Sequence, residues 1–165
     1  LDPSAPRSSG ESARVARKEG AVSFWMRRES VGNQRAILWS AGEGPADASI
    51  QAHIYPDGRV GFFMEDGRHD VLITTTETID AGTWHHFAVS WSPSVVELYL
   101  DGKQIARETG VRAMQQGNLP ELRFGSGPAS QDTTSFNGWL DDAALWDGAL
   151  TPLEVQQQYR SASGD

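Results

Sequence analysis

The stretch 82–102, GTWHHFAVSWSPSVVELYLDG, constrains the fold more than any other part of the chain. Side chains of a β-strand alternate between its two faces, so Phe87, Val89 and Trp91 share one apolar face. After a Ser-Pro-Ser break the alternation resumes in VVELYL, and the Asp-Gly pair at the end supplies the positive φ angles of a tight hairpin turn. The stretch therefore predicts the central antiparallel pair of a β-sandwich.

Further short alternating stretches recur along the chain, with turn residues between them. They cover 21–30, 32–42, 49–65, 71–76, 103–108, 121–125 and 139–146. Near the end, Thr151 as N-cap, Pro152 at the first helical position and Glu154 three residues after the cap predict a short helix. Many short strands, almost no helix and 17 glycines indicate an all-β sandwich or barrel.

Composition limits the classes of function. The net charge of −8 and the absence of a basic run beyond 14–18 argue against a nucleic-acid partner. The chain has no cysteine, which excludes disulfides and thiolate chemistry. No apolar run approaches the ~18 residues that span a bilayer. We therefore expect no membrane span in this segment and no nucleic-acid binding.

The chain divides into a short leading segment and one domain. Residues 1–12 are rich in proline, serine and glycine without periodicity, as in a linker or a cloning remnant, and we expect them to be poorly ordered. Residues 13–165 fit a single domain. Because the sequence starts at Leu1 without methionine, we expect it to be an excised domain of a larger chain.

Two motifs carry a family resemblance. They are GTWHHFAVSWSPSVVELYLDGKQIA at 82–106 and FNGWLDDAALWDGALTPLEVQQQY at 136–159, accompanied by AVSFWMR at 21–27. With them, the chain resembles the bacterial laminin-G-like domains of the concanavalin A-like lectin/glucanase superfamily. The resemblance covers about 21–159 and implies a jelly-roll β-sandwich of two antiparallel sheets with one short C-terminal helix. It also implies a module of a larger extracytoplasmic or cell-surface protein.

The chain departs from the family at its first strand. Members of the family usually begin with a strand that pairs beside the last one, and here only 11–18 could supply it.

The carboxylates do not have the spacing for catalysis. The glucanase branch needs two carboxylates two or four positions apart on one strand, so that both face one cleft. The acidic pairs here, 65–66 and 141–142, are adjacent, and a strand directs adjacent side chains to opposite faces. We therefore expect no enzymatic activity, and a glycoside hydrolase is the least favoured reading.

Asp141 is the candidate metal ligand. It shares parity with Trp139 and Leu145, so it is predicted to point inward if those side chains face the core. A buried carboxylate needs backbone N–H donors, a basic partner or a metal. Capping of loop amides is the favoured alternative. Calcium is the other, because the resemblance includes domains that hold calcium at the rim of the sandwich.

Two tyrosines are the candidate ligand-binding residues. Most of the six tryptophans are predicted to pack in the core or under loops. Tyr55 lies next to the Pro-Asp-Gly turn at 56–58, and Tyr99 points away from its apolar neighbours, so both are predicted to be exposed.

These observations favour a non-catalytic recognition module that binds a glycan or an extracellular protein through the concave sheet or the loop rim. The alternative is a structural spacer domain without a ligand of its own.

Overall fold

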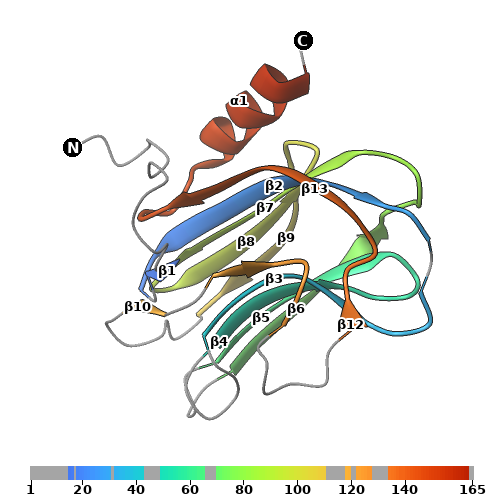
Figure 1. Cartoon of the computed structure of the whole chain (residues 1–165). Helices are drawn as coiled ribbons and strands as arrows, with labels where there is room; N and C mark the ends of the chain where they lie inside the picture. The colour runs from blue at the N-terminus through green and yellow to red at the C-terminus, as the bar shows by residue number, and fades with distance from the viewer. Residues whose placement is uncertain are drawn as a thin grey trace.

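The computed structural model describes residues 15–16, 18–30, 32–42, 49–65, 70–110, 118–119, 122–127 and 134–163. These residues form a β-sandwich of two sheets with a helix packed on one of them (Figure 1). The expectations for 1–12 fall outside the described residues. The prediction of an all-β jelly-roll sandwich with one short C-terminal helix is confirmed.

The first sheet has the strand order β11-β3-β4-β5-β6, and β12 pairs with β3. Its strands are β3 (Ala36–Gly42), β4 (Ser49–Ile54), β5 (Arg59–Glu65), β6 (Asp70–Thr78), β11 (Arg123–Phe124) and β12 (Thr134–Ser135). Neighbouring strands are antiparallel, apart from the short parallel pair of β12 and β3.

The second sheet has the order β13-β2-β7-β8-β9 and is antiparallel throughout. Its strands are β2 (Gly20–Arg28), β7 (His85–Ser92), β8 (Val95–Leu100), β9 (Lys103–Thr109) and β13 (Gly138–Trp146). The short strand β1 (Val15–Ala16) pairs with β10 (Asn118–Leu119) and not with β13, so it does not supply the family's first strand beside the last one.

The core lies between the inner faces of the two sheets. Phe87, Val89 and Trp91 of β7 are fully buried there, as the alternation predicts. Trp91 stacks against Trp39 and Phe62 of the facing sheet, with ring centroids 6.3 and 6.4 Å apart. Burying each such side chain contributes roughly 1.5–3 kcal/mol or more to folding, so this cluster holds the sheets together.

A helix covers the outer face of the second sheet. The helix α1 (Pro152–Ser163) begins with the predicted capping box, in which Glu154 Oε2 accepts the Thr151 N–H at 2.7 Å. The Glu154 N–H donates in turn to Thr151 Oγ1 at 3.3 Å. Val155 of the helix is fully buried in a second apolar cluster, together with Ala21, Ala88, Tyr99, Trp146 and Leu150. Of the described part of the chain, no helix is long and apolar enough to cross a membrane.

Candidate functional site

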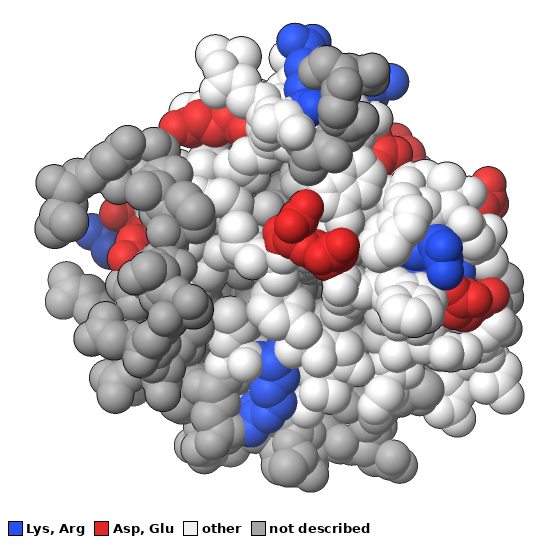
Figure 2. Space-filling view, turned by 45° about the horizontal axis from the view of Figure 1, so that its top comes forward, with Lys and Arg blue, Asp and Glu red and all other residues white. Residues whose placement is uncertain are grey.

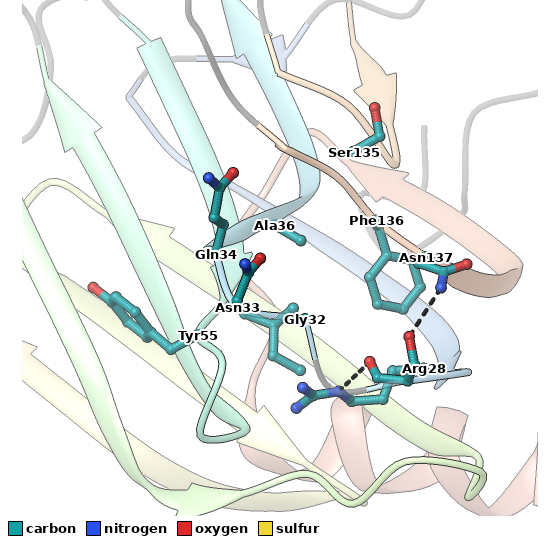
Figure 3. Close-up of a pocket in the computed structure, with 11 residues that line it drawn as sticks. Arg28, Gly32, Asn33, Gln34, Ala36, Tyr55, Ser135, Phe136 and Asn137 are labelled. Atoms are coloured by element: carbon teal, nitrogen blue, oxygen red, sulfur yellow. Dashed lines mark hydrogen bonds between the residues drawn. The ribbon is translucent and has the colours of Figure 1, made fainter.

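The candidate site is a pocket at the end of the sandwich where β2 and β4 finish. Its volume is about 120 Å³. Four stretches that are distant in sequence meet there: the end of β2 with the segment that follows it, the start of β3, the end of β4, and the link between β12 and β13. The described lining residues are Arg28, Ser30, Gly32, Asn33, Gln34, Ala36, Ile54, Tyr55, Ser135, Phe136 and Asn137 (Figure 3).

The hairpin between β4 and β5 forms one side of this end. The Tyr55 N–H donates to the Arg59 carbonyl at 2.8 Å, and the Gly58 N–H donates to the Tyr55 carbonyl at 3.0 Å. Gly58 has a φ of +92°, and a Cβ there would lie 2.8 Å from the Ile79 oxygen. Glycine is therefore required where the hairpin meets the segment after β6.

Arg28 lies in the wall of the pocket and is only 4% exposed. Its Nη2 donates to the Pro56 carbonyl at 3.1 Å, and its Nη1 and Nε donate to the carbonyls of Ile79 and Ser30, each at 3.4 Å. Its own carbonyl accepts the Gly82 N–H at 2.8 Å. The side chain thus connects three separate loops and fixes the shape of the pocket.

The remaining polar lining consists of amides and hydroxyls. Asn137 Nδ2 donates to Ser30 Oγ at 3.0 Å, which joins the β12–β13 link to the segment after β2. Asn33 and Gln34 rise between Tyr55 on one side and Phe136 on the other (Figure 3). The described lining contains no carboxylate, thiol or imidazole, so it offers no acid and base pair for glycoside hydrolysis.

Tyr55 lies at the pocket and is half-buried, which agrees with its predicted place beside the turn. The Arg59 guanidinium lies over the ring, 5.5 Å from its centroid, and forms an exposed ion pair of 2.7 Å with Asp57. On another side the ring packs edge-on against His53, with centroids 4.9 Å apart. These contacts hold the ring in one orientation.

His53 supports Tyr55 from inside the structure. It is fully buried, and its ring lies against Gly61, where a Cβ would collide with Nε2. Burial lowers the pKa of His53 to about 3, and the nearby charge of Arg35 lowers it further. The imidazole is therefore neutral at physiological pH, and neither of its ring nitrogens has a hydrogen-bond partner.

The structure corrects the prediction that Tyr99 is exposed. Its side chain does point away from the core, but that face of β8 is covered, and Tyr99 has no exposed surface. Its hydroxyl donates to Glu97 Oε2 at 2.9 Å. Burial and this hydrogen bond raise the pKa of Tyr99 beyond its ordinary value. The ring has no free face for a sugar.

The structure also corrects the inward orientation predicted for Asp141. A β-bulge between Asp141 and Ala144 changes the parity of β13, and Asp142 adopts a φ of +47° there. Leu140 and Leu145 pack on the core on either side of the bulge, which leaves Asp141 exposed. Its Oδ1 accepts the Asp142 N–H at 2.9 Å.

The described residues around Asp141 do not fit a calcium site. Calcium takes six to eight oxygen ligands. Among the residues with described positions, no group of three or more His, Cys, Asp or Glu could hold a metal ion. Two other acidic loop residues, Asp66 and Asp132, fall outside the described ranges.

Sequence reasoning missed an exposed aromatic cluster on the outer face of the second sheet. Trp139 is 58% exposed and Trp84 is 39% exposed, and the Arg27 guanidinium lies between them, 5.8 and 5.6 Å from the ring centroids. Glu29 Oε1 accepts hydrogen bonds from Arg27 at 2.8 Å and from Trp139 Nε1 at 2.7 Å, which hold the pKa of Glu29 below its ordinary value. The odd spacing between Leu140 and Leu145 was the signal that Trp139 faces outward.

Charges on this side of the molecule are dispersed. Figure 2 turns the top of Figure 1, with β13 and α1, toward the viewer, and acidic and basic residues lie there in small separate groups on a largely uncharged surface. No continuous basic patch is visible on the described part of this face.

Comparison with known protein families follows from this geometry. A family model of laminin G type, described as the concanavalin A-like lectin/glucanases superfamily, matches residues 7–156. The chain belongs to this superfamily. The resemblance drawn from the two motifs is therefore confirmed, and the superfamily match extends over both sheets and the start of α1.

Curated relatives within reach of the superfamily match are pentraxin-type proteins. The rat sushi, von Willebrand factor type A, EGF and pentraxin domain-containing protein 1 is 28% identical over 141 residues, which are 81% of this chain and 4% of that protein. C-reactive protein of Xenopus laevis is 33% identical over 81 residues, 45% of this chain and 34% of that protein. The chain thus spans a small part of the first and about a third of the second.

Solved structures share the fold. The CBM40 of a Ruminococcus gnavus IT-sialidase, bound to α2,3-sialyllactose, has a TM-score of 0.74 at 16% identity, over 87% of this chain and 83% of that one. Domain 4 of AbnA, a GH43 extracellular arabinanase from Geobacillus stearothermophilus, in complex with arabinotriose, has a TM-score of 0.68 at 20% identity, over 87% and 66%. These likenesses establish the sandwich and its similarity to carbohydrate-binding modules.

Proposed function

We propose that this domain is a non-catalytic carbohydrate-recognition module of a larger extracytoplasmic protein, and that the pocket beside Tyr55 takes the sugar. The observation that carries the proposal is the pocket itself. An aromatic ring held by His53 and Arg59 stands at a small concavity whose polar lining consists of amides, hydroxyls and one guanidinium. Sugars need such a combination, because a pyranose has both an apolar face and a set of hydroxyls.

The comparisons support this proposal. A carbohydrate-binding module and an arabinanase domain, both described with a bound saccharide, have the same fold as this chain. The pocket's described lining lacks the paired carboxylates of a glycosidase, which favours binding without hydrolysis. The extracytoplasmic location is supported by the extracellular arabinanase among the similar structures.

The test is a glycan-array screen followed by titration calorimetry of the best ligand. Tyr55→Ala should weaken binding by about tenfold or more, whereas Tyr55→Phe, which keeps the ring, should stay within about threefold. Trp139→Ala is the matched control, since it removes an exposed aromatic ring outside the pocket. Equal affinity of Tyr55→Ala and the unaltered domain would refute the assignment of this pocket.

Protein binding is the second candidate, and the exposed cluster of Trp84, Arg27 and Trp139 favours it. Tryptophan and arginine are enriched where protein interfaces have their strongest contacts. In that case Trp139→Ala would abolish capture of the partner and Tyr55→Ala would not. A domain that binds nothing on glycan and matrix-protein panels would be a structural spacer.

A further inference from the structure

The pocket contains a buried positive charge that no negative charge compensates. Arg28 is 4% exposed, and its three hydrogen-bond acceptors are the neutral backbone carbonyls of Ser30, Pro56 and Ile79. Across the described ranges, Arg28 forms no ion pair with a carboxylate. A guanidinium does not lose its proton in a protein, so the charge remains when the side chain is buried. A buried charge without a counterion is costly.

The surroundings of the pocket leave this charge exposed to whatever enters it. The described lining has one cation and no anion, although the chain as a whole carries a net charge of −8. The nearby Asp57 carboxylate is paired with Arg59, and the Glu29 carboxylate, next in sequence to Arg28, is paired with Arg27. The carboxylates of these two neighbours are therefore already engaged.

We propose that this pocket selects a saccharide that carries a carboxylate, such as a uronic or sialic acid. The inference rests on the proposed glycan-binding function and names the class of sugar. A guanidinium has five N–H donors, and the carbonyls occupy three of them here, so two remain for a carboxylate. The carboxylate supplies the missing negative charge where water is partly excluded and the attraction is strong.

The other lining groups complete the site for a sugar ring. Tyr55 offers an aromatic side to the apolar face of the ring. The amides of Asn33 and Asn137 and the hydroxyl of Ser135 can exchange hydrogen bonds with ring hydroxyls. The small volume, about 120 Å³, fits one terminal acidic residue of a glycan better than the interior of a long chain.

The first experiment removes only the charge of the sugar. Trigalacturonate and α2,3-sialyllactose are titrated into the domain by calorimetry, each beside its own methyl ester. We expect at least one acid to bind about tenfold more tightly than its ester, with affinity that falls as sodium chloride rises. Equal binding of acid and ester would overturn the inference and leave the proposed glycan-binding function intact. No binding of any sugar on the array would refute both.

The second experiment changes the charge of the pocket without touching Arg28. Asn137→Asp keeps the size of the side chain and adds a carboxylate beside Ser30, which Arg28 also contacts. It should weaken acid binding by about tenfold and leave ester binding within about twofold. Gln104→Glu on β9, exposed and outside the lining, is the matched control and should change neither.

A third variant tests the guanidinium directly. Arg28→Lys keeps the charge but loses the planar set of donors, so acid binding should fall while the preference for acid over ester persists. Its melting curve is recorded alongside, because Arg28 also connects three loops. If Asn137→Asp and Gln104→Glu weaken acid binding equally, the attraction comes from overall charge and the assignment to this pocket is wrong.

Discussion

Gly61 of β5 shows how closely the side chains behind the pocket are packed. The His53 ring occupies the space above this glycine, so that a methyl group there would meet the imidazole. His53 in turn contacts the edge of Tyr55. A change at a residue that never touches a ligand can therefore displace the aromatic ring that we assign to sugar binding.

We predict that Gly61→Ala lowers the free energy of unfolding by about 1–3 kcal/mol, because overpacking forces side chains from their preferred positions. It should also weaken sugar binding through Tyr55. Gly148→Ala is the matched control, since nothing lies within 4 Å of its added methyl group. Its effect should stay within about 0.5 kcal/mol. Urea denaturation measures both, and equal stability of the two variants would contradict the described packing.

At the same scale, the sequence located Tyr55 correctly but not the other two candidate residues. The Pro-Asp-Gly turn sets the position of Tyr55, and that is a local signal. The orientation of Tyr99 away from the core was also right, yet its burial depends on a helix more than 50 positions later in the chain. Asp141 was placed on the wrong face because period-two counting assumes a regular strand, and β13 has a bulge.

The helix α1 is the element that closes the outer face of the second sheet. Tyr159 stacks on Trp25 with centroids 5.7 Å apart, and His86 lies 6.1 Å from the same tyrosine. Ser90 Oγ donates to the Leu150 carbonyl at 3.0 Å and accepts the Leu150 N–H at 2.9 Å. The helix and the segment before it are thus fixed by both aromatic packing and hydrogen bonds.

We predict that Thr151→Ala destabilises the domain by about 1 kcal/mol, because it removes the side chain that caps the Glu154 N–H. Loosening of the helix should alter the tryptophan fluorescence of Trp25. Ser161→Ala, near the other end of the same helix, removes a hydroxyl that bonds only to the carbonyl of Gln158 and should cost much less. The comparison of their thermal melts isolates the cap, and identical melts would contradict this role.

The elements themselves were largely predictable. The strands around 85–100 and the helix after Thr151 follow from alternation and from capping chemistry, both of which are local. The bulge in β13 has no comparable signature in single residues. It could be recognised only by requiring that Leu140 and Leu145 both face the core.

On the scale of the whole molecule, each sheet holds a buried neutral histidine on its outward side. His53 lies on β4 and His86 on β7, at 0% and 3% exposure. Burial lowers the pKa of His53 to about 3 and that of His86 to about 4, although the charge of Asp101 raises the latter slightly. Protonation of either would place a charge in an apolar environment.

We predict that the domain loses stability as the pH falls from about 6.5 toward 4. Below pH 6.5 the unfolded chain binds protons on both histidines, whereas the folded chain does not, so acid favours unfolding. Each histidine should contribute a loss of roughly 2 kcal/mol at pH 5 relative to pH 8. Urea denaturation at the two pH values measures the sum.

The variant His86→Gln separates this effect from general acid sensitivity. It should reduce the difference between pH 8 and pH 5 by about 2 kcal/mol, even if it lowers stability at both. An unchanged difference would show that His86 is not the group that titrates.

The pocket could not be predicted from the sequence. Its walls come from 28–36, 54–55 and 135–137, and none of these stretches contains a recognisable binding motif. They meet because β2, β3 and β4 end at the same side of the sandwich and the β12–β13 link passes beside them. Such a site depends on topology, which periodicity does not specify.

The three loops that Arg28 joins give the site a property useful to an experimenter. Because its walls are brought together only when both sheets have formed, the unfolded chain has no equivalent site. A sugar that occupies the pocket therefore raises the melting temperature, by an amount equivalent to about 2.7 kcal/mol at one hundred times its dissociation constant. A simple melting assay against a collection of saccharides can identify the natural ligand of this domain.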